Sequence, residues 1–287
     1  ATLATNQNAI DLNPSADYNP ETSDFDPETL ILGNSFGLVA VIDDQPQGVF
    51  FGSSFARDDA GNILGLEVQN GEIRLDGNGD AIFTTGTLND DGILVDASGN
   101  VILPVRDGTR SIIGDPNPDF TASWINEFEL GSRFSARVQL DGSFGGDVFN
   151  FTRRLASLRV FGTLSDYQDE IEGRVPVGYY QNFGVPGDPE GRNYGTFSIF
   201  ENWIEDGTFV KVREVSLSYL VPATLVQGYG IQALRLTVYG RNLASFDSYS
   251  GYDPETNVAG QSTGVRGYDF VEVPIPRTFG VTLRATL

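Results

Sequence analysis

Carboxylates are the residues whose number and spacing first suggest chemistry in this sequence. Two pairs, Glu127/Glu129 and Asp253/Glu255, could serve the two-carboxyl chemistry of a glycosidase, since residues two apart on a strand share one face. The chain holds 39 acidic residues, however, so such pairs also arise by chance. Nothing in the sequence indicates a pocket or a raised pKa around them. The sequence therefore favours a protein that is not an enzyme.

A second acidic group, Asp76, Asn78 and Asp80, occupies the first three ligand positions of an EF-hand loop. Position six of that loop is Ala81 rather than Gly, and position twelve is Thr87 rather than Glu. A calcium ion in this loop is one interpretation, and an Asx-rich hairpin turn without metal is the alternative. No other part of the sequence requires a cofactor.

The composition excludes several other chemistries. The chain has no cysteine and no histidine, which rules out disulfides, thiolate metal sites and catalysis that depends on histidine. Its formal net charge of −21 argues against nucleic acid as a partner. No stretch has the length and apolarity of a transmembrane helix or a signal peptide. Because the chain lacks Met and opens in a strand-like run, we expect it to be a piece of a longer protein.

Among the elements that must position such residues, the most clearly predicted is the last stretch of the chain, residues 278–287. Its apolar residues alternate with polar ones, which is the pattern of a strand with one apolar and one polar face. The predicted apolar side is Phe279, Val281, Leu283, Ala285 and Leu287, and the polar side includes Arg284. The stretch is about as long as a strand that crosses a bilayer.

Similar amphipathic strands are predicted over residues 120–130, 133–141, 208–220 and 233–243, with the end of another at residues 1–6. The strand over 208–220 changes phase in its first half, which predicts a bulge. Gly131 and Ser132 form a turn, and residues 222–230 form a somewhat longer one. Short helices are predicted over 152–158 and 166–172, the second with Asp166 as N-cap and Gly173 past its end.

The connections between these strands alternate in length. Those over 7–119, 145–206 and 245–274 are long, whereas those over 131–132 and 222–231 are short. Within the first, runs such as DDAGN, DGNGD and NDDG predict small hairpins, and residues 36–42 and 49–55 are expected to pair. Short turns on one side and long loops on the other are typical of outer-membrane barrels. We therefore divide the chain at residue 119, into a partial strand with a long acidic loop region and five membrane strands with two long loops.

Several motifs resemble one family, the SusC/RagA-type TonB-dependent transporters of the Bacteroidetes outer membrane. The most specific are YSGYDPE (Tyr249–Glu255) and PIPRTF (Pro274–Phe279), and the longest is IEDGTFVKVREVSLSYL (Ile204–Leu220). Further matches in the same order are LATNQNAIDL (Leu3–Leu12), GVFFG (Gly48–Gly52), IGDPNPDF (Ile113–Phe120), GGDVFN (Gly145–Asn150), VYGRNL (Val238–Leu243) and RGYD (Arg266–Asp269). The chain departs from the family in ending on Leu287 rather than an aromatic residue.

The resemblance implies an all-β fold: the carboxy-terminal antiparallel strands of a large outer-membrane barrel of the roughly 22-stranded type. It implies an integral protein of a Gram-negative outer membrane that imports glycans or peptides. The implied partners are a SusD-like surface lipoprotein as lid, membrane lipid, and the TonB system acting through the missing amino-terminal part. This chain would supply barrel wall and external loops.

Two sets of side chains are candidates for contact with a solute or partner. Arg235, Tyr239, Arg241 and Arg284 would face the lumen, where they could instead pair with acidic residues of a plug. Tyr179, Tyr180, Tyr194 and Trp203 lie in a predicted loop and could contact a solute or the lid, or form small loop cores. The alternative function is a secreted or surface-anchored acidic β-protein that binds glycan or calcium.

Overall fold

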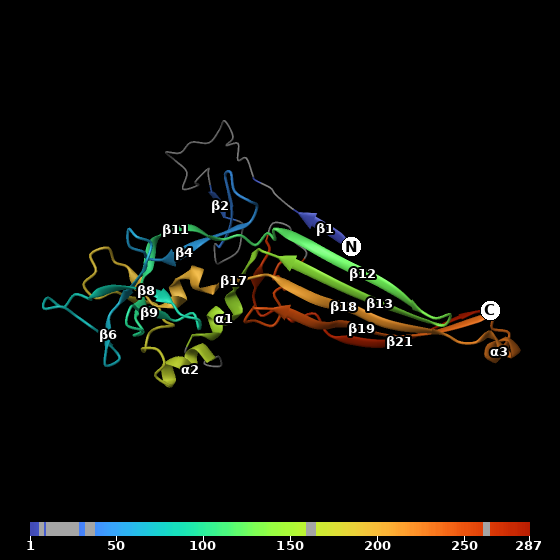
Figure 1. Cartoon of the computed structure of the whole chain (residues 1–287). Coiled ribbons are helices and arrows are strands. Elements are labelled where there is room, and N and C mark those ends of the chain that lie inside the picture. The colour runs from blue at the N-terminus through green and yellow to red at the C-terminus, as the bar shows by residue number, and fades with distance from the viewer. Residues whose placement is uncertain (6–8, 10–28, 32–37, 159–164, 261–264) are drawn as a thin grey trace, which may run out of the picture.

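The chain forms a long twisted β-sheet joined at one end to a globular β-rich unit (Figure 1). The computed structural model describes residues 1–5, 9, 29–31, 38–158, 165–260 and 265–287. The start of the first predicted long connection lies almost wholly outside the described residues, which before residue 29 include only residue 9 of that connection. No described helix is long and apolar enough to cross a membrane.

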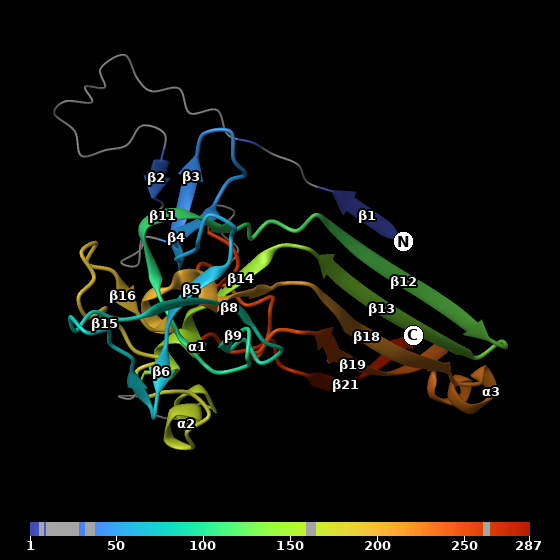
Figure 2. The ribbon, with the colours of Figure 1, turned by 60° about the vertical axis from the view of Figure 1, so that its left-hand side comes forward.

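The long sheet has six antiparallel strands in sequence order, which confirms the predicted set. They are β1 (Thr2–Thr5), β12 (Phe120–Leu130), β13 (Phe134–Phe144), β18 (Phe209–Leu220), β19 (Ala233–Asp247) and β21 (Thr278–Thr286). The strands lie side by side in both ribbon views (Figures 1 and 2). Antiparallel neighbours can be joined by tight turns, and this sheet alternates tight turns with long excursions.

The short connections gather at the end of the sheet remote from the globular unit (Figure 1). Gly131, with a φ of +71°, makes the turn between β12 and β13. The turn between β18 and β19 contains a helical turn, α3 (Ala223–Val226), followed by η3 (Gln227–Tyr229). The predicted bulge is confirmed, because the pairing of β18 with β13 shifts between Val212 and Glu214 and leaves Arg213 as the extra residue.

All three long connections fold together into the globular unit, which we call the loop unit: the described parts of residues 29–114, 145–206 and 248–270. Its three small sheets are β11-β4-β3-β2, β10-β5-β8-β9 and β17-β14-β20. The strands are β2 (Thr29–Ile31), β3 (Val39–Ile42), β4 (Val49–Phe55), β5 (Ile63–Leu66), β8 (Phe83–Leu88), β9 (Leu94–Asp96), β10 (Leu103–Pro104), β11 (Arg106–Gly114), β14 (Asp147–Asn150), β17 (Ile204–Asp206) and β20 (Tyr268–Asp269).

Two hairpins and four short helices complete the loop unit. They are β6 (Val68–Gln69) with β7 (Glu72–Ile73), β15 (Phe183–Gly184) with β16 (Asn193–Tyr194), α1 (Phe151–Ala156), α2 (Ser165–Ile171), η1 (Thr196–Ser198) and η2 (Phe200–Trp203). The predicted pairing of residues 36–42 with 49–55 is confirmed where described, since Val39 pairs with Phe50.

Both predicted helices are present, with shifted starts. Asn150 caps α1, and its side chain accepts the N–H of Arg153 at 2.8 Å. The α2 helix begins at Ser165, so Asp166 lies inside it rather than at the N-cap as predicted. Gly173, with a φ of +74°, follows the end of α2 as expected.

The core of the loop unit is built around Phe149, which is 1% exposed. Its ring lies 5.3 Å from Tyr268, 5.7 Å from Phe200, 5.8 Å from Phe151 and 6.3 Å from Phe50. These contacts join residues from all three long connections. Aromatic pairs at such distances add to the free energy gained from burying their area, so this cluster ties the three segments together.

The predicted hairpin turns are confirmed as one repeated five-residue turn. In each, the first side chain accepts backbone N–H groups two and four residues on, and a glycine with positive φ occupies the fourth position. The turns begin at Asp58, Asp76, Asn89 and Asp96. Glycine adopts positive φ without the steric cost that a Cβ carries, which explains the recurring Asx-x-x-Gly pattern.

Candidate functional site

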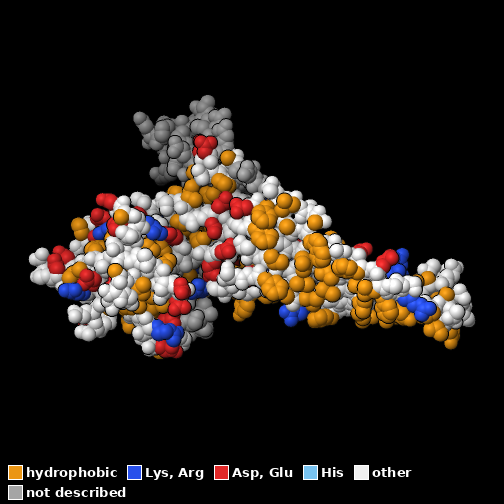
Figure 3. All heavy atoms as spheres, viewed as in Figure 1, with side chains coloured by type: hydrophobic (Ala, Val, Ile, Leu, Met, Phe, Trp, Pro, Cys, Tyr) orange, Lys and Arg blue, Asp and Glu red, His pale blue; other side chains and the backbone are white. Residues whose placement is uncertain are grey.

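The long sheet has one continuous apolar face. Residues directly opposite one another across strands lie on the same face, and the pairing register aligns apolar residues from strand to strand. One row reads Phe128, Ala136, Leu217, Val238 and Val281, and the next reads Leu130, Phe134, Tyr219, Leu236 and Leu283. Within the described residues nothing covers this face, and Phe279 is 75% exposed. Figure 3 shows hydrophobic side chains gathered over the sheet.

The opposite face of the sheet is mainly polar, with Ile125, Phe209 and Leu220 as apolar exceptions. A typical row reads Glu129, Ser135, Ser218, Thr237 and Thr282. All four residues predicted to face a lumen lie on this polar face, because Arg235 pairs with Arg284, Arg241 with Thr278 and Tyr239 with Gly280. That the face lines a lumen stays a prediction.

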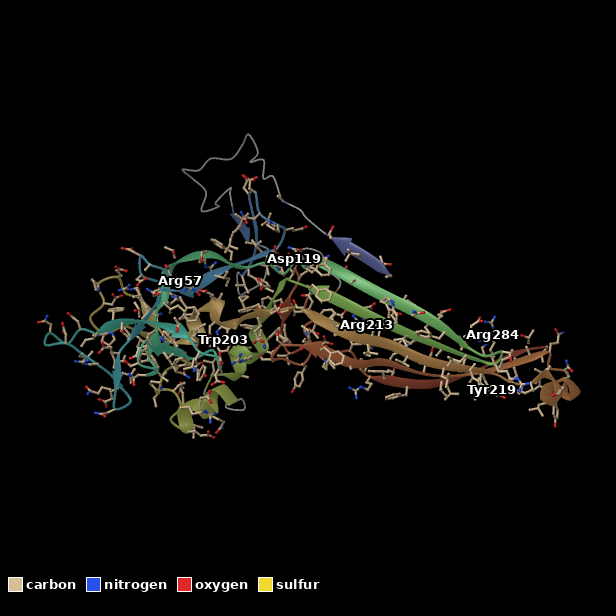
Figure 4. All side chains as sticks on the ribbon, viewed as in Figure 1. Arg57, Asp119, Trp203, Arg213, Tyr219 and Arg284 are labelled. Carbon is tan, nitrogen blue, oxygen red and sulfur yellow. The ribbon has the colours of Figure 1, made fainter. Side chains whose placement is uncertain are left out.

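The contacts of these four residues differ along the sheet. Arg241 donates to Glu214 Oε2 at 2.9 Å, and its guanidinium lies 4.9 Å from the Tyr239 ring centroid. Among the described residues, Arg235 donates only to Ser135 Oγ, at 3.2 Å, and it stands opposite Arg284. Arg284 has no ion pair within the described residues and lies near the end of the sheet remote from the loop unit (Figure 4). Like charges directly opposite are unfavourable, so this pair suits an anionic neighbour.

Near the loop unit, the polar face carries an ion-pair network that we call the β18 network: Asp141, Lys211, Arg213, Asp253 and Glu255. Lys211 is 4% exposed, and its Nζ donates to Asp253 and, at 2.9 Å, to Glu255. Arg213 donates to Asp141 at 3.0 Å and to Glu255 at 2.5 Å. The network fixes the YDPE segment of the third long connection onto strand β18. Figure 4 shows Arg213 midway between the loop unit and the far end of the sheet.

Burial alone would raise the pKa of Glu255, but the hydrogen bonds from Arg213 and Lys211 hold it below its ordinary value. The carboxylates of Asp253 and Glu255 are therefore engaged by cations. A pair held in this way is suited to fixing a loop, and Glu255 lacks the raised pKa that a general acid needs.

A cleft of about 610 Å³ opens where the polar face meets the loop unit. Gln139, Asp141 and Arg213 line it from the sheet, and Asp147, Asn257 and Arg266 from the loops. Burial raises the pKa of Asp147, although the N–H of Asp115 donates to its Oδ2 at 2.7 Å. The cleft is thus a polar hollow with both signs of charge on its wall.

Three of the four loop candidates are core residues. Tyr179, Tyr180 and Trp203 are 1%, 5% and 0% exposed; Tyr179 Oη accepts the N–H of Leu94, and Trp203 Nε1 donates to the Thr196 carbonyl. Their packing matches the alternative of small loop cores, and they offer no surface to a solute or lid. Tyr194 is half-buried and packs 5.7 Å from the exposed ring of Phe183. Burial raises the pKa of Tyr194.

The candidate calcium loop is one of the five-residue turns. Asp76 Oδ1 accepts the N–H groups of Asn78 and Asp80 at 2.8 and 3.0 Å, and these hydrogen bonds lower the pKa of Asp76. No group of three or more potential ligand side chains within the described residues is arranged to hold a metal ion. Turn geometry alone accounts for Asp76.

Sequence reasoning did not single out Lys211, Arg213 or Arg266. Lys211 is the only lysine in the chain, and Arg213 occupies the predicted bulge. The single lysine and the predicted bulge are the sequence features that could have identified Lys211 and Arg213 as candidates. Arg266 was visible only as part of the RGYD motif, because its place in the cleft depends on how the loop folds.

Comparison with known proteins gives partial matches. No protein-family model matches the chain. It is 30% identical over 209 residues to TonB-dependent receptor P3 of Formosa agariphila, a match that covers 69% of this chain and 20% of that receptor. It is 23% identical over 200 residues to TonB-dependent receptor P26 of the same organism, covering 67% of this chain and 19% of the relative. The chain therefore spans about a fifth of the length of these relatives.

Among solved structures, the RagAB peptide transporter gives a TM-score of 0.49 with 17% identity, over 89% of this chain and 24% of that one. The RagAB peptide importer in its open-open state gives a TM-score of 0.48 with 14% identity, over 91% and 24% of the two chains.

Proposed function

We propose, since the chain belongs to the TonB-dependent receptors, that it forms the carboxy-terminal part of a SusC/RagA-type barrel in a Gram-negative outer membrane. The long sheet would be a section of barrel wall, and the loop unit would lie outside the cell. The finer assignment to the SusC/RagA type rests on the resemblance of the YSGYDPE and PIPRTF motifs.

The observation that carries this proposal is the uncovered apolar face of the long sheet. A soluble protein rarely leaves so large an apolar patch exposed to water, whereas a barrel strand places apolar residues toward lipid and polar residues inward. Phe279, Val281 and Leu283 on β21 are 75%, 66% and 65% exposed. In a membrane, lipid would cover these apolar side chains, whose contact with water is unfavourable.

The height of the apolar face supports the same proposal. On β12 it extends from Phe120 to Leu130, which at about 3.3 Å per residue is ~33 Å along the strand. At a tilt of about 40° this spans roughly 25 Å, the height of the apolar band of outer-membrane barrels. Aromatic pairs mark both ends, Phe120 with Phe144 at 4.6 Å and Phe134 with Tyr219 at 4.8 Å, as interfacial girdles do.

In this arrangement the polar face lines the lumen, and Arg235, Tyr239, Arg241 and Arg284 contact a plug or a passing solute. The whole receptor imports glycans or peptides, using TonB through its amino-terminal part and a SusD-like lipoprotein that closes over the loop unit. The loop unit supplies the surface for that lid. Calcium, if bound at Asp76, would stiffen one hairpin and is not required.

Membrane fractionation of the complete receptor tests the proposal. We expect the receptor to stay in the detergent-soluble outer-membrane fraction after separate washes with carbonate, high salt and chelator, because lipid contact does not depend on salt or calcium. A known peripheral membrane protein from the same cells serves as the washed-off control. Release by salt or chelator would instead support a secreted or surface-anchored acidic β-protein that binds glycan or calcium.

A further inference from the structure

The cleft between the polar face and the loop unit contains an arginine whose charge is not matched. Arg213 on its wall is held by Asp141 and Glu255, so its charge is compensated by contact. Arg266 lines the same cleft and is half-buried. Within the part of the chain that the structure describes, the Arg266 guanidinium has no hydrogen bond or ion pair.

A second group in the cleft also lacks a partner. Asn257 Nδ2 donates to the carbonyls of Gly260 and Val265 at 3.0 and 2.7 Å, which fixes the orientation of the amide. Its Oδ1 is buried and accepts no hydrogen bond from the residues that the structure describes. A buried acceptor without a donor is unfavourable, and Asn257, like Arg266, lines the cleft.

We propose that Arg266 and Asn257 form a subsite for a carboxylate that has a hydroxyl or amide N–H close beside it. The fork of the guanidinium matches the two oxygens of a carboxylate, and Asn257 Oδ1 accepts the neighbouring O–H or N–H. Both an acidic sugar and the carboxyl end of a peptide carry this combination. The inference rests on the proposed function, because the cleft then lies on the path of the solute at the outer mouth of the barrel.

The β18 network positions one wall of this subsite. Pro254, Glu255, Thr256 and Asn257 line the cleft in succession, and Lys211 and Arg213 fix that segment through Asp253 and Glu255. Each of the three carboxylates of the network contacts at least one of its two cations, so they oppose an incoming anion less than free carboxylates would.

Binding to the complete, detergent-purified receptor tests the subsite with two pairs of probes. One pair is a galacturonate oligosaccharide and its neutral galactose counterpart, and the other is a short peptide with a free terminal carboxylate and the same peptide as a terminal amide. We expect the wild type to prefer the charged member of one pair, and that pair identifies the source of the carboxylate. Arg266→Gln should weaken binding of the charged member about tenfold or more and leave the neutral member unchanged.

Two further variants keep the test specific. Arg266→Lys retains a point charge but not the fork, so it should recover part of the lost affinity. Arg74→Gln removes an exposed arginine paired with Glu67, away from the cleft, and should change nothing. The subsite is overturned if the wild type binds charged and neutral probes alike, binds none of them, or loses no selectivity in Arg266→Gln. In any of these cases, retention of the receptor in washed outer membranes would leave the proposed function standing.

Discussion

Phe149 on β14 exposes 1% of its surface and Phe279 on β21 exposes 75%, although both are phenylalanines on strands. The first lies in the loop unit, where apolar side chains turn inward onto one core. The second lies on the long sheet, where they turn outward along one face. The two regions contain the same apolar residue types, but the loop unit buries them and the long sheet exposes them. Water around the loop unit and lipid around the sheet, as in the proposed function, would suit this difference.

Removing an aromatic ring should therefore have unequal effects in the two regions. Phe149→Ala would leave a cavity among four aromatic neighbours, and we expect the loop unit to lose about 3–5 kcal/mol of stability. Phe279→Ala should cost much less, because the ring packs against little of the protein. Limited proteolysis of the outer loops on intact cells measures the difference. Equal protease sensitivity of the two variants would contradict the comparison.

An arginine placed on either face of β21 tests which face of the sheet meets lipid. Val281→Arg puts a guanidinium on the apolar face, where a position near the membrane centre should cost about 2–4 kcal/mol. Thr282→Arg, the adjacent residue on the polar face, is the matched control and should be tolerated. The amount of assembled barrel, seen by its resistance to unfolding in unheated SDS gels, reports the outcome. A deficit in Thr282→Arg rather than Val281→Arg would reverse the assignment of the two faces.

The β18 network joins the two regions, and its strength can be followed at Lys211. Asp253→Asn removes a charged hydrogen-bond partner worth about 1.5 kcal/mol or more, so acylation of Lys211 by an amine reagent should accelerate about tenfold. Because this chain has no other lysine, peptide mapping locates the modification without ambiguity. The conservative Asp253→Glu variant should react more slowly than Asp253→Asn. A Lys211 that reacts rapidly in the wild type would show that the network does not hold the loop.

The smallest effect concerns acid sensitivity in the loop unit. The side-chain hydrogen bonds of Arg192, with the backbone N–H of Arg192, lower the pKa of Asp188 below its ordinary value of 3.8. A carboxyl group with a lowered folded-state pKa stabilises the fold above pH 3.8, and this contribution is lost as the pH falls through the lowered value. Asp188→Asn should remove that contribution, less than about 1 kcal/mol. Hydrogen exchange of residues 185–192 at pH 6 and pH 3 measures it; a protection difference equal to that of the wild type would contradict the assignment.

The strands of the long sheet were predictable because their pattern is local. Alternation in residues 278–286 places Val281 and Arg284 on opposite faces whatever else the chain does, and the phase change before Glu214 marks the bulge at Arg213. The five-residue turns were predictable for the same reason, since the hydrogen bonds of the Asp96 side chain reach residues two and four positions away.

What only the tertiary structure decided are the contacts between residues far apart in the chain. Tyr179 and Trp203 are core residues because three long connections pack around Phe149, and no local pattern specifies that packing. Asp253 and Glu255, which by spacing alone suggested a catalytic pair, instead bind Lys211 and Arg213 some forty positions earlier. These contacts form because they give the most favourable burial and charge pairing over the whole fold. The sequence by itself determined the two faces of each strand, whereas the folded chain determined what each face meets.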